Sequence, residues 1–321
     1  MGLADLAVQN LASPMVLFFA LGLLAAFAKS DLNIPEPVAK LISIYLLMSI
    51  GFRGGSEVVH HGMTLQLVAT ICGGVALSFA MPLVAFAILV RTSRLSPVDA
   101  AAVAGYYGSI SAVTFAAVTG TLNQLALPFD GYMVAVAAAM ETPAIISALH
   151  LARPHRDELA NANESSIWRE VLLNGSVVTL LGAFAVGMLT GQNGSNSVKP
   201  FLVDLFPGFL CLFLLDMGLI AGRGLRHGRQ YLTPALGVFA VLMPLIGAAA
   251  AFVLSGVIGL STGTTVVLMT LAASASYIAA PAALRLALPE ANAAIPLTMS
   301  LGITFPFNLL IGIPLYIWIA K

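Results

Sequence analysis

The chain has 321 residues, of which 59% are hydrophobic and only 9% are charged, and its formal net charge at pH 7 is zero. Soluble proteins contain roughly 25% charged residues, so this composition excludes a soluble globular protein. A nucleic-acid-binding protein is excluded as well, because the sequence has no basic patch interleaved with aromatic side chains. The composition therefore predicts an integral membrane protein surrounded by the lipid bilayer.

Ten segments are long and apolar enough to cross a membrane, which takes about 20 mostly apolar residues. In chain order they lie near residues 13–29, 36–52, 64–90, 97–120, 130–152, 168–190, 200–221, 231–256, 263–287 and 293–319. The sequence thus predicts an all-α membrane protein with ten transmembrane helices.

The basic residues lie mostly on one side of these spans. That side has eleven of them: Lys29, Lys40, Arg91, Arg94, Arg153, Arg156, Arg169, Arg223, Arg226, Arg229 and Arg285. The other side has only Arg53, Lys199 and Lys321. Cytoplasmic loops are enriched in Lys and Arg, so both termini are expected outside and the polar connection at residues 153–167 inside.

The two halves of the chain, residues 1–152 and 168–321, echo each other. An offset of 167 residues aligns four pairs: Gly51 with Gly218, Gly55 with Gly222, His60 with His227, and Ser109 with Ser276. Each half has five predicted spans, and an odd number makes the second half enter the membrane from the opposite face. We therefore expect a 5+5 inverted repeat joined by the cytoplasmic connection.

The fourth and ninth spans have polar centres, Gly108-Ser109-Ile110-Ser111 and Ser274-Ala275-Ser276-Tyr277. Hydrocarbon supplies no hydrogen-bond partners, so hydroxyls and broken helices at membrane depth persist only where protein or water lines a cavity. The fourth span opens with Ser96-Pro97-Val98-Asp99, a favourable helix start, and Pro281 suits a fresh start in the ninth. Both spans are expected to break at their centres.

Two broken spans related by inversion point the amino ends of their second halves at one another. Each end has roughly half a positive charge and several free N–H groups, so together they form an anion site without a cationic side chain. We expect the anion to be held there by Ser109, Ser111, Thr114, Ser274 and Ser276, with Tyr277 beside them. The alternative is that these hydroxyls only join close-packed helices.

Glu141, in the fifth span, is the one carboxylate expected at mid-membrane. A charge there costs about 2.5 to 3.5 kcal/mol on insertion scales, so an ionisable residue is a functional candidate. Together with Ser111 and Ser276 it is predicted to attract a coupling cation or to carry a proton. The alternative is a protonated Glu bonded to a neighbouring helix.

Several stretches resemble the bacterial sodium-dependent bicarbonate transporter family. They are Leu11-Ala12-Ser13-Pro14, Ile34-Pro35-Glu36, Gly51-Phe52-Arg53-Gly54-Gly55, Val98-Asp99-Ala100, GSISAVTFAAV at 108–118, METPAI around Glu141 and ASASYIAAPAALR at 273–285, followed by Asn292, Ser300, Pro306 and Pro314. The resemblance covers nearly the whole chain in order.

This resemblance implies a core domain that moves against a gate domain, a homotrimer in the bacterial plasma membrane, and uptake of bicarbonate with sodium as the co-transported ion. It further implies that Ser111, Thr114, Ser274 and Ser276 line the site, and that a PII-like regulator could dock on the cytoplasmic side. The chain departs from the best-known members at Tyr277, where they have an Asp that would be a strong ligand for a hard cation.

Two other functions stay open from the sequence. A carrier of the same architecture could take another small carboxylate or organic anion, with a proton as the coupling ion. An intramembrane enzyme is the remote alternative, but the sequence has no His-Glu-x-x-His zinc motif and no paired aspartates spaced for magnesium-diphosphate binding. We therefore expect a secondary active transporter rather than an enzyme.

Overall fold

The computed structural model describes residues 11–61, 65–141, 143–152, 175–228, 232–277, 280, 284, 288 and 290–321. Within these residues the regular structure is helical, and seven helices are long and apolar enough to cross a membrane. Pro14–Phe27 and Thr262–Ala272 are shorter apolar helices. The predicted all-α membrane fold is confirmed at this level. The connection at 153–167 lies outside the described residues.

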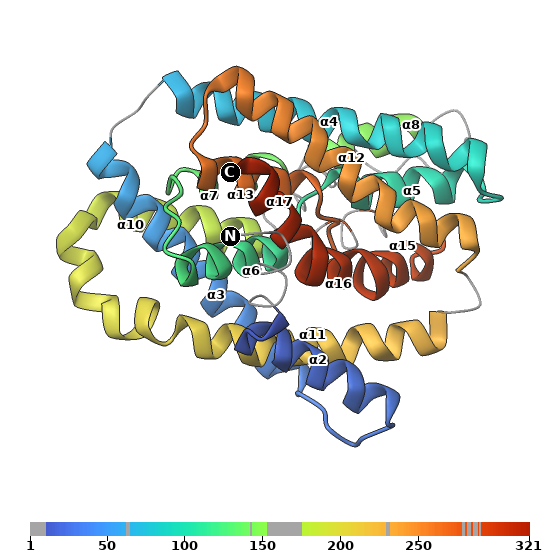
Figure 1. The fold of residues 1–321 in the computed structure, drawn as a ribbon, viewed down its shortest axis with the longest axis horizontal. Coiled ribbons are helices and arrows are strands. Elements are labelled where there is room, and N and C mark those ends of the chain that lie inside the picture. Colours follow the sequence, from blue (N-terminus) through green and yellow to red (C-terminus); the bar gives the residue numbers. More distant parts are fainter. Residues whose placement is uncertain are drawn as a thin grey trace.

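The described residues of the first half of the chain form seven helices (Figure 1). They are α2 (Pro14–Phe27), α3 (Glu36–His61), α4 (Leu65–Thr92), α5 (Pro97–Gly108), α6 (Ala112–Gln124), α7 (Met133–Ala139) and α8 (Pro143–Ala152). The second half contributes α10 (Gly175–Lys199), α11 (Phe206–Gly228), α12 (Pro234–Ile258), α13 (Thr262–Ala272), α15 (Ala294–Met299), α16 (Phe305–Phe307) and α17 (Ile313–Ala320), with π-helical segments η2 (Pro200–Asp204), η4 (Ser300–Thr304) and η5 (Asn308–Gly312).

Three of the helices begin in the same way, with a hydroxyl residue at the N-cap followed directly by Pro. The side chains of Ser13, Ser96 and Thr233 each accept a hydrogen bond from the backbone N–H three residues later. The hydroxyl satisfies one of the free N–H groups of the first turn, and Pro fits there because its own N–H is missing. These caps fix the starts of α2, α5 and α12.

The residues between the sixth and seventh predicted spans are helical. The chain stays helical from α10 through η2 into α11, and only Gly191 leaves helical geometry, with φ 53° and ψ −147°. Glycine reaches a positive φ without a steric penalty, so the kink falls there. In Figure 1 the chain turns between α10 and α11 at the left of the view.

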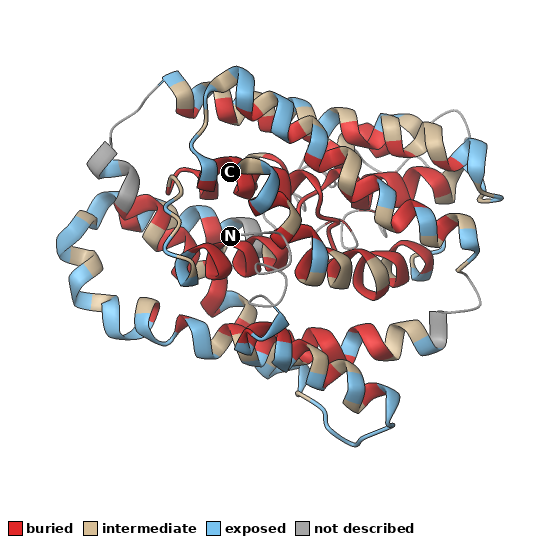
Figure 2. Cartoon of the chain, in the orientation of Figure 1, coloured by how far each residue is buried: buried red, intermediate tan, exposed pale blue. Residues whose placement is uncertain are grey.

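The helices pack in two sets. In the first, α3 lies along α10 and α11 lies along α2, with α11 also touching α3. In the second, α4 contacts α5, α8 and α12. The helices α6 and α13 lie between them and are buried almost throughout, as the red ribbons of Figure 2 show. A helix that is apolar on every side has to be enclosed by others.

Glycines let α3 and α10 approach closely. A Cβ atom built on Gly55 would clash with the carbonyl oxygen of Phe184, and one on Gly187 would clash with the carbonyl oxygen of Phe52. Small residues at the interface are how membrane helices bring their backbones together.

The helices α2 and α11 meet in the same manner. A Cβ on Gly22 would strike the carbonyl oxygen of Leu215, and one on Gly218 would strike that of Phe19. Both helix pairs therefore depend on a glycine from each partner.

Candidate functional site

The fourth span is broken where the sequence places its polar centre. The helix α5 ends at Gly108, α6 begins at Ala112, and both Ser109 and Ser111 have extended backbone angles. The Ser111 hydroxyl accepts a hydrogen bond of 3.1 Å from the Thr114 N–H and so caps α6. Thr114 takes part through its backbone, one turn inside the helix.

The start of α6 has free donors. Among the described residues, the N–H groups of Ala112 and Val113 have no hydrogen-bond partner. Both residues line a small pocket between α6, α3 and α11, together with Ile50 and Phe213. The positive end of α6 thus borders a space between this helix and the first helix set.

The ninth span also leaves helical geometry where predicted. The helix α13 ends at Ala272, and residues 273–277 follow without helical structure. The Ser276 hydroxyl accepts a 3.2 Å hydrogen bond from the Ala280 N–H. The predicted restart at Pro281 lies outside the described residues.

The two breaks are hydrogen-bonded to each other. The Ser111 N–H donates to the Ser274 hydroxyl at 2.9 Å, and the Ser276 N–H donates to the Tyr106 carbonyl at 2.8 Å. The Ser274 hydroxyl in turn donates to the Leu271 carbonyl at 2.7 Å. Backbone groups that each helix leaves unpaired at its break are therefore satisfied by the other break, as buried polar groups require.

A third interruption lies beside these two. The fifth span divides into α7 and α8 around Met140 and Glu141, because Pro143 lacks the N–H that would continue the helix. The freed carbonyls find hydroxyl donors: Ser78 bonds to the Met140 carbonyl, and Ser109 bonds to the Glu141 carbonyl at 3.1 Å. Glu141 therefore adjoins the first break through its backbone.

The predicted site residues come together on these segments, and all are almost fully buried. Their exposed fractions run from 1% at Ser109 and Ser276 to 6% at Glu141 and 8% at Tyr277. The Tyr277 hydroxyl is buried and forms no hydrogen bond with a described residue. A buried hydroxyl without a partner is costly, so this one is available to a ligand or a water molecule.

Sequence reasoning missed Asn308. Its side-chain amide donates to the Ala273 carbonyl at 2.8 Å and accepts a 3.0 Å bond from the Tyr316 hydroxyl. Asn308 starts the π-helical segment η5, and such turns occur often at functional sites. An amide inside the last apolar span was the available signal, because polar groups at membrane depth need a partner.

The tenth span supplies a second support. The Thr304 hydroxyl donates to the Ala240 carbonyl at 2.7 Å and lies 2.6 Å from the Tyr107 hydroxyl. These bonds join α12, η4 and the last turn of α5. The tenth span therefore supports the two breaks through two residues, Asn308 and Thr304.

Comparison with known proteins gives one result that covers almost the whole chain. A family model described as the Na⁺-dependent bicarbonate transporter superfamily matches residues 14–321. A search among curated proteins found no match. Because the matched range includes both breaks, Glu141 and the last span, the chain belongs to the Na⁺-dependent bicarbonate transporter superfamily.

Proposed function

We propose that the protein is a secondary active transporter that takes up a small anion, bicarbonate first, together with sodium. The observation that carries the proposal is the start of α6, where the N–H groups of Ala112 and Val113 have no partner among the described residues and both residues line a pocket. A helix amino end attracts anions through its dipole and its free donors. Family membership names the sodium-dependent uptake of bicarbonate as the activity to test.

The glycine contacts support an inverted repeat of five spans each. Gly51 and Gly55 of α3 face the carbonyls of Leu180 and Phe184 on α10. Gly218 and Gly222 of α11 face those of Phe19 and Leu23 on α2. Each glycine of α3 is 167 residues before its counterpart in α11, which is the offset found in the sequence. The carbonyl residues that they face, on α2 and α10, are likewise related by one constant offset of 161 residues.

Hydrogen bonds of side chains near the helix starts also support the inverted repeat. Asp99, near the start of α5, accepts a 2.8 Å bond from the Asn292 N–H, in the segment before α15. Near the start of α13, the Thr264 hydroxyl donates to Asp130, in the segment between α6 and α7, at 2.6 Å. Each broken span is thus tied to the segment that follows the other.

At the breaks, the helix caps of the two halves are related by an offset of 165 residues, two fewer than the offset of 167 taken from the sequence. Ser96 and Ser261 cap α5 and α13, and Ser111 and Ser276 accept from the N–H groups of the following helical residues. Both pairs differ by 165, so Ser276 corresponds to Ser111 rather than to Ser109. The reason is that the spans of the two halves differ in length.

The two helix sets are the parts that we assign to the gate and the core. The gate consists of α2, α3, α10 and α11, and the core contains the breaks with α4, α8 and α12. The hydrogen bonds between the breaks make the core one body, which fits an elevator movement against the gate. A homotrimer in the bacterial plasma membrane, with both termini outside, completes the proposal. The segment on which a PII-like regulator would dock lies outside the described residues.

Sodium coupling has a physical reason. An inside-negative potential opposes an entering anion by about 2.3 kcal/mol per charge per 100 mV, and a co-bound cation removes that penalty. Among the described residues no group of three His, Cys, Asp or Glu side chains converges on a metal site. The sodium ion would therefore take hydroxyl and carbonyl oxygens at the helix breaks, as in other broken-helix carriers, with Glu141 nearby.

The test is uptake of labelled bicarbonate into proteoliposomes with and without an inward sodium gradient. Sulfate and small carboxylates are tested as alternative substrates, and a proton gradient is tested as an alternative driving force. We expect saturable bicarbonate uptake that needs sodium. Uptake of an organic anion driven by protons would establish the alternative carrier, and no uptake of any anion would refute the proposal.

The site variant is Ser111→Ala, with Ser255→Ala as its matched control. Ser255 is a buried residue of α12 whose hydroxyl donates to the Ala251 carbonyl within its own helix. We expect Ser111→Ala to lose most uptake and Ser255→Ala to keep it, with both proteins folded.

A further inference from the structure

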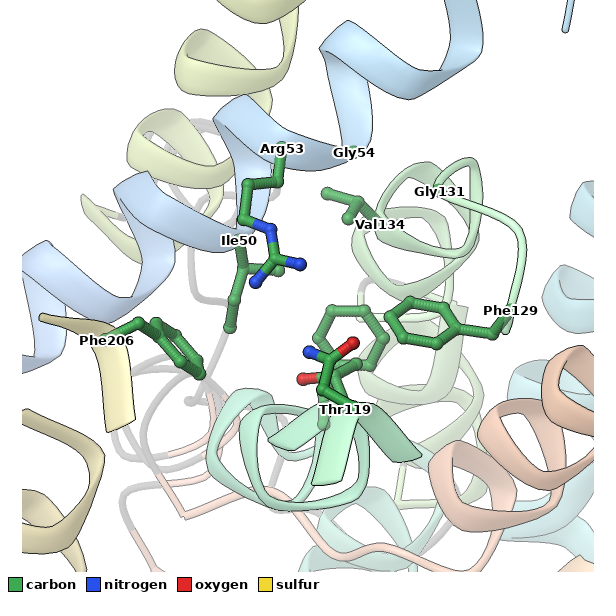
Figure 3. A pocket seen from close by; sticks show the side chains of 10 residues that line it. Ile50, Arg53, Gly54, Thr119, Phe129, Gly131, Val134 and Phe206 are labelled. Carbon is green, nitrogen blue, oxygen red and sulfur yellow. The ribbon is translucent and has the colours of Figure 1, made fainter. Parts of the chain in front are cut away.

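A second pocket lies between the first helix set and α6 and α7, at the far end of α6 from the break (Figure 3). It is lined by Arg53 from α3, Thr119 and Asn123 from α6, Phe129 from the following segment and Phe206 from α11. It contains about 370 Å³ of free space, its open mouth included.

The guanidinium of Arg53 points into this pocket. Figure 3 shows its nitrogens directed toward the space between Phe206, Phe129 and Thr119. Arg53 is half-buried, and among the described residues no carboxylate or other acceptor bonds to its side chain. A charge that is partly withdrawn from water without a partner is costly, so an outside anion would stabilise it.

The walls determine the class of anion. A guanidinium presents a planar fork of donors that matches the two oxygens of a carboxylate or of bicarbonate. The Asn123 amide supplies hydrogen-bonding groups on the opposite wall, where the Thr119 hydroxyl already donates to the Ala116 carbonyl, and the rings of Phe129 and Phe206 provide apolar sides. The pocket therefore suits a small planar oxyanion.

The small pocket at the start of α6 lies along the same helix, nearer the break. Ile50 lines both the Arg53 pocket and the small one at the start of α6. The two pockets follow one side of α6, from Ala112 at the break to Asn123 near the helix end.

We propose that Arg53 forms an anion-capture site at the mouth between core and gate, where it binds the planar oxyanion cargo before the cargo reaches the start of α6. This inference rests on the proposed function, because the captured anion is the transported one. In the topology that the basic residues predict, Arg53 lies at the outer end of α3, where an incoming anion arrives first.

The experiment measures the KM and kcat of bicarbonate uptake for Arg53→Gln and Arg53→Lys in proteoliposomes at fixed sodium. We expect Arg53→Gln to raise KM by about tenfold, which corresponds to roughly 1.4 kcal/mol, with kcat nearly unchanged. Arg53→Lys should fall between, because its ammonium keeps the charge but loses the fork. Arg91→Gln is the matched control: Arg91 is exposed on α4 and bonds to the Ala87 carbonyl of its own helix.

A second readout is the ionic-strength dependence of KM, varied with N-methylglucamine gluconate. Capture by a charge weakens as salt rises, so the KM of the wild type should increase with salt and that of Arg53→Gln should not. An unchanged KM, an equal salt dependence, or a loss confined to kcat would overturn the capture site.

Two outcomes of the uptake experiment distinguish a failure of the capture site from a failure of the proposed function. If the wild type takes up bicarbonate and Arg53→Gln does so with the same KM, the transporter proposal stands and only the capture site is refuted. If the wild type takes up no anion, the transporter proposal itself is refuted. If Arg53→Gln does not fold, Asn123→Leu tests the opposite wall, and an unchanged KM there also counts against the site.

Discussion

The backbone N–H of Ser111 donates a 2.9 Å hydrogen bond to the hydroxyl of Ser274, although the two residues are 163 positions apart. Ser111 caps the helix that leaves the first break, and Ser274 lies at the second. The bond therefore holds the start of α6 in place relative to α13. Because both residues are buried, neither can exchange this partner for bulk water.

Replacing Ser274 by Ala should destabilise the protein by about 1–3 kcal/mol, the cost of leaving a buried donor unsatisfied. It should also lower uptake, because the start of α6 loses its fixed position. Thermal unfolding in detergent, followed by circular dichroism, measures the first effect and proteoliposome uptake the second. Ser255→Ala is the control, and equal melting of the two variants would contradict this account.

The sequence predicted the first break to within a residue or two, because glycines and hydroxyls inside an apolar span weaken the helix at that point. The same reasoning placed Ser96 as the cap of α5. It did not find Asn308 as the partner of Ala273, since the partner depends on how one helix is rotated against another, which composition does not encode. It also missed the pocket at Arg53, because that space exists only where α3 and α11 pack against α6 and the segment after it.

Asn308 offers a test of the second break that separates shape from hydrogen bonding. Asn308→Asp keeps the size but replaces the amide donor with an oxygen that repels the Ala273 carbonyl. We expect it to destabilise the protein and to reduce uptake more than Tyr316→Phe does, since the latter removes only the 3.0 Å bond on the other side. Thermal unfolding and uptake of both variants provide the comparison. A milder effect of Asn308→Asp would show that the Ala273 contact is dispensable.

Two glycines of α10 test the close packing of the gate. Gly187→Ala would push a methyl group into the Phe52 carbonyl, whereas Gly182→Ala would meet nothing within 4 Å. We expect Gly187→Ala to destabilise the protein by about 1–3 kcal/mol through overpacking. Gly182→Ala should be neutral or stabilise it by up to about 1 kcal/mol, because Ala favours the helix. Melting curves decide, and a Gly187→Ala protein as stable as Gly182→Ala would refute the close approach.

Glu141→Gln tests the cation role without disturbing the break. The Ser109 hydroxyl bonds to the backbone carbonyl of Glu141, which the substitution keeps. Loss of the carboxylate should raise the sodium concentration for half-maximal uptake by about tenfold or more. Glu36→Gln, at the exposed start of α3, should leave it unchanged. Full sodium dependence in Glu141→Gln would remove this residue from the cation site.

Ile50 lines both the capture pocket and the small pocket at the start of α6, so a larger side chain there should obstruct an anion that moves from one pocket to the other. Ile50 is 7% exposed and lines both pockets. We expect Ile50→Trp to lower the rate of uptake by about tenfold or more, equivalent to at least 1.4 kcal/mol in the barrier. Ile44→Trp is the control on the same helix, because Ile44 is 41% exposed and lines neither pocket. Both variants are compared by uptake and by melting temperature. A folded Ile50→Trp protein with normal uptake would show that the anion reaches α6 by another path, since a Trp side chain at this position leaves too little space for it to pass.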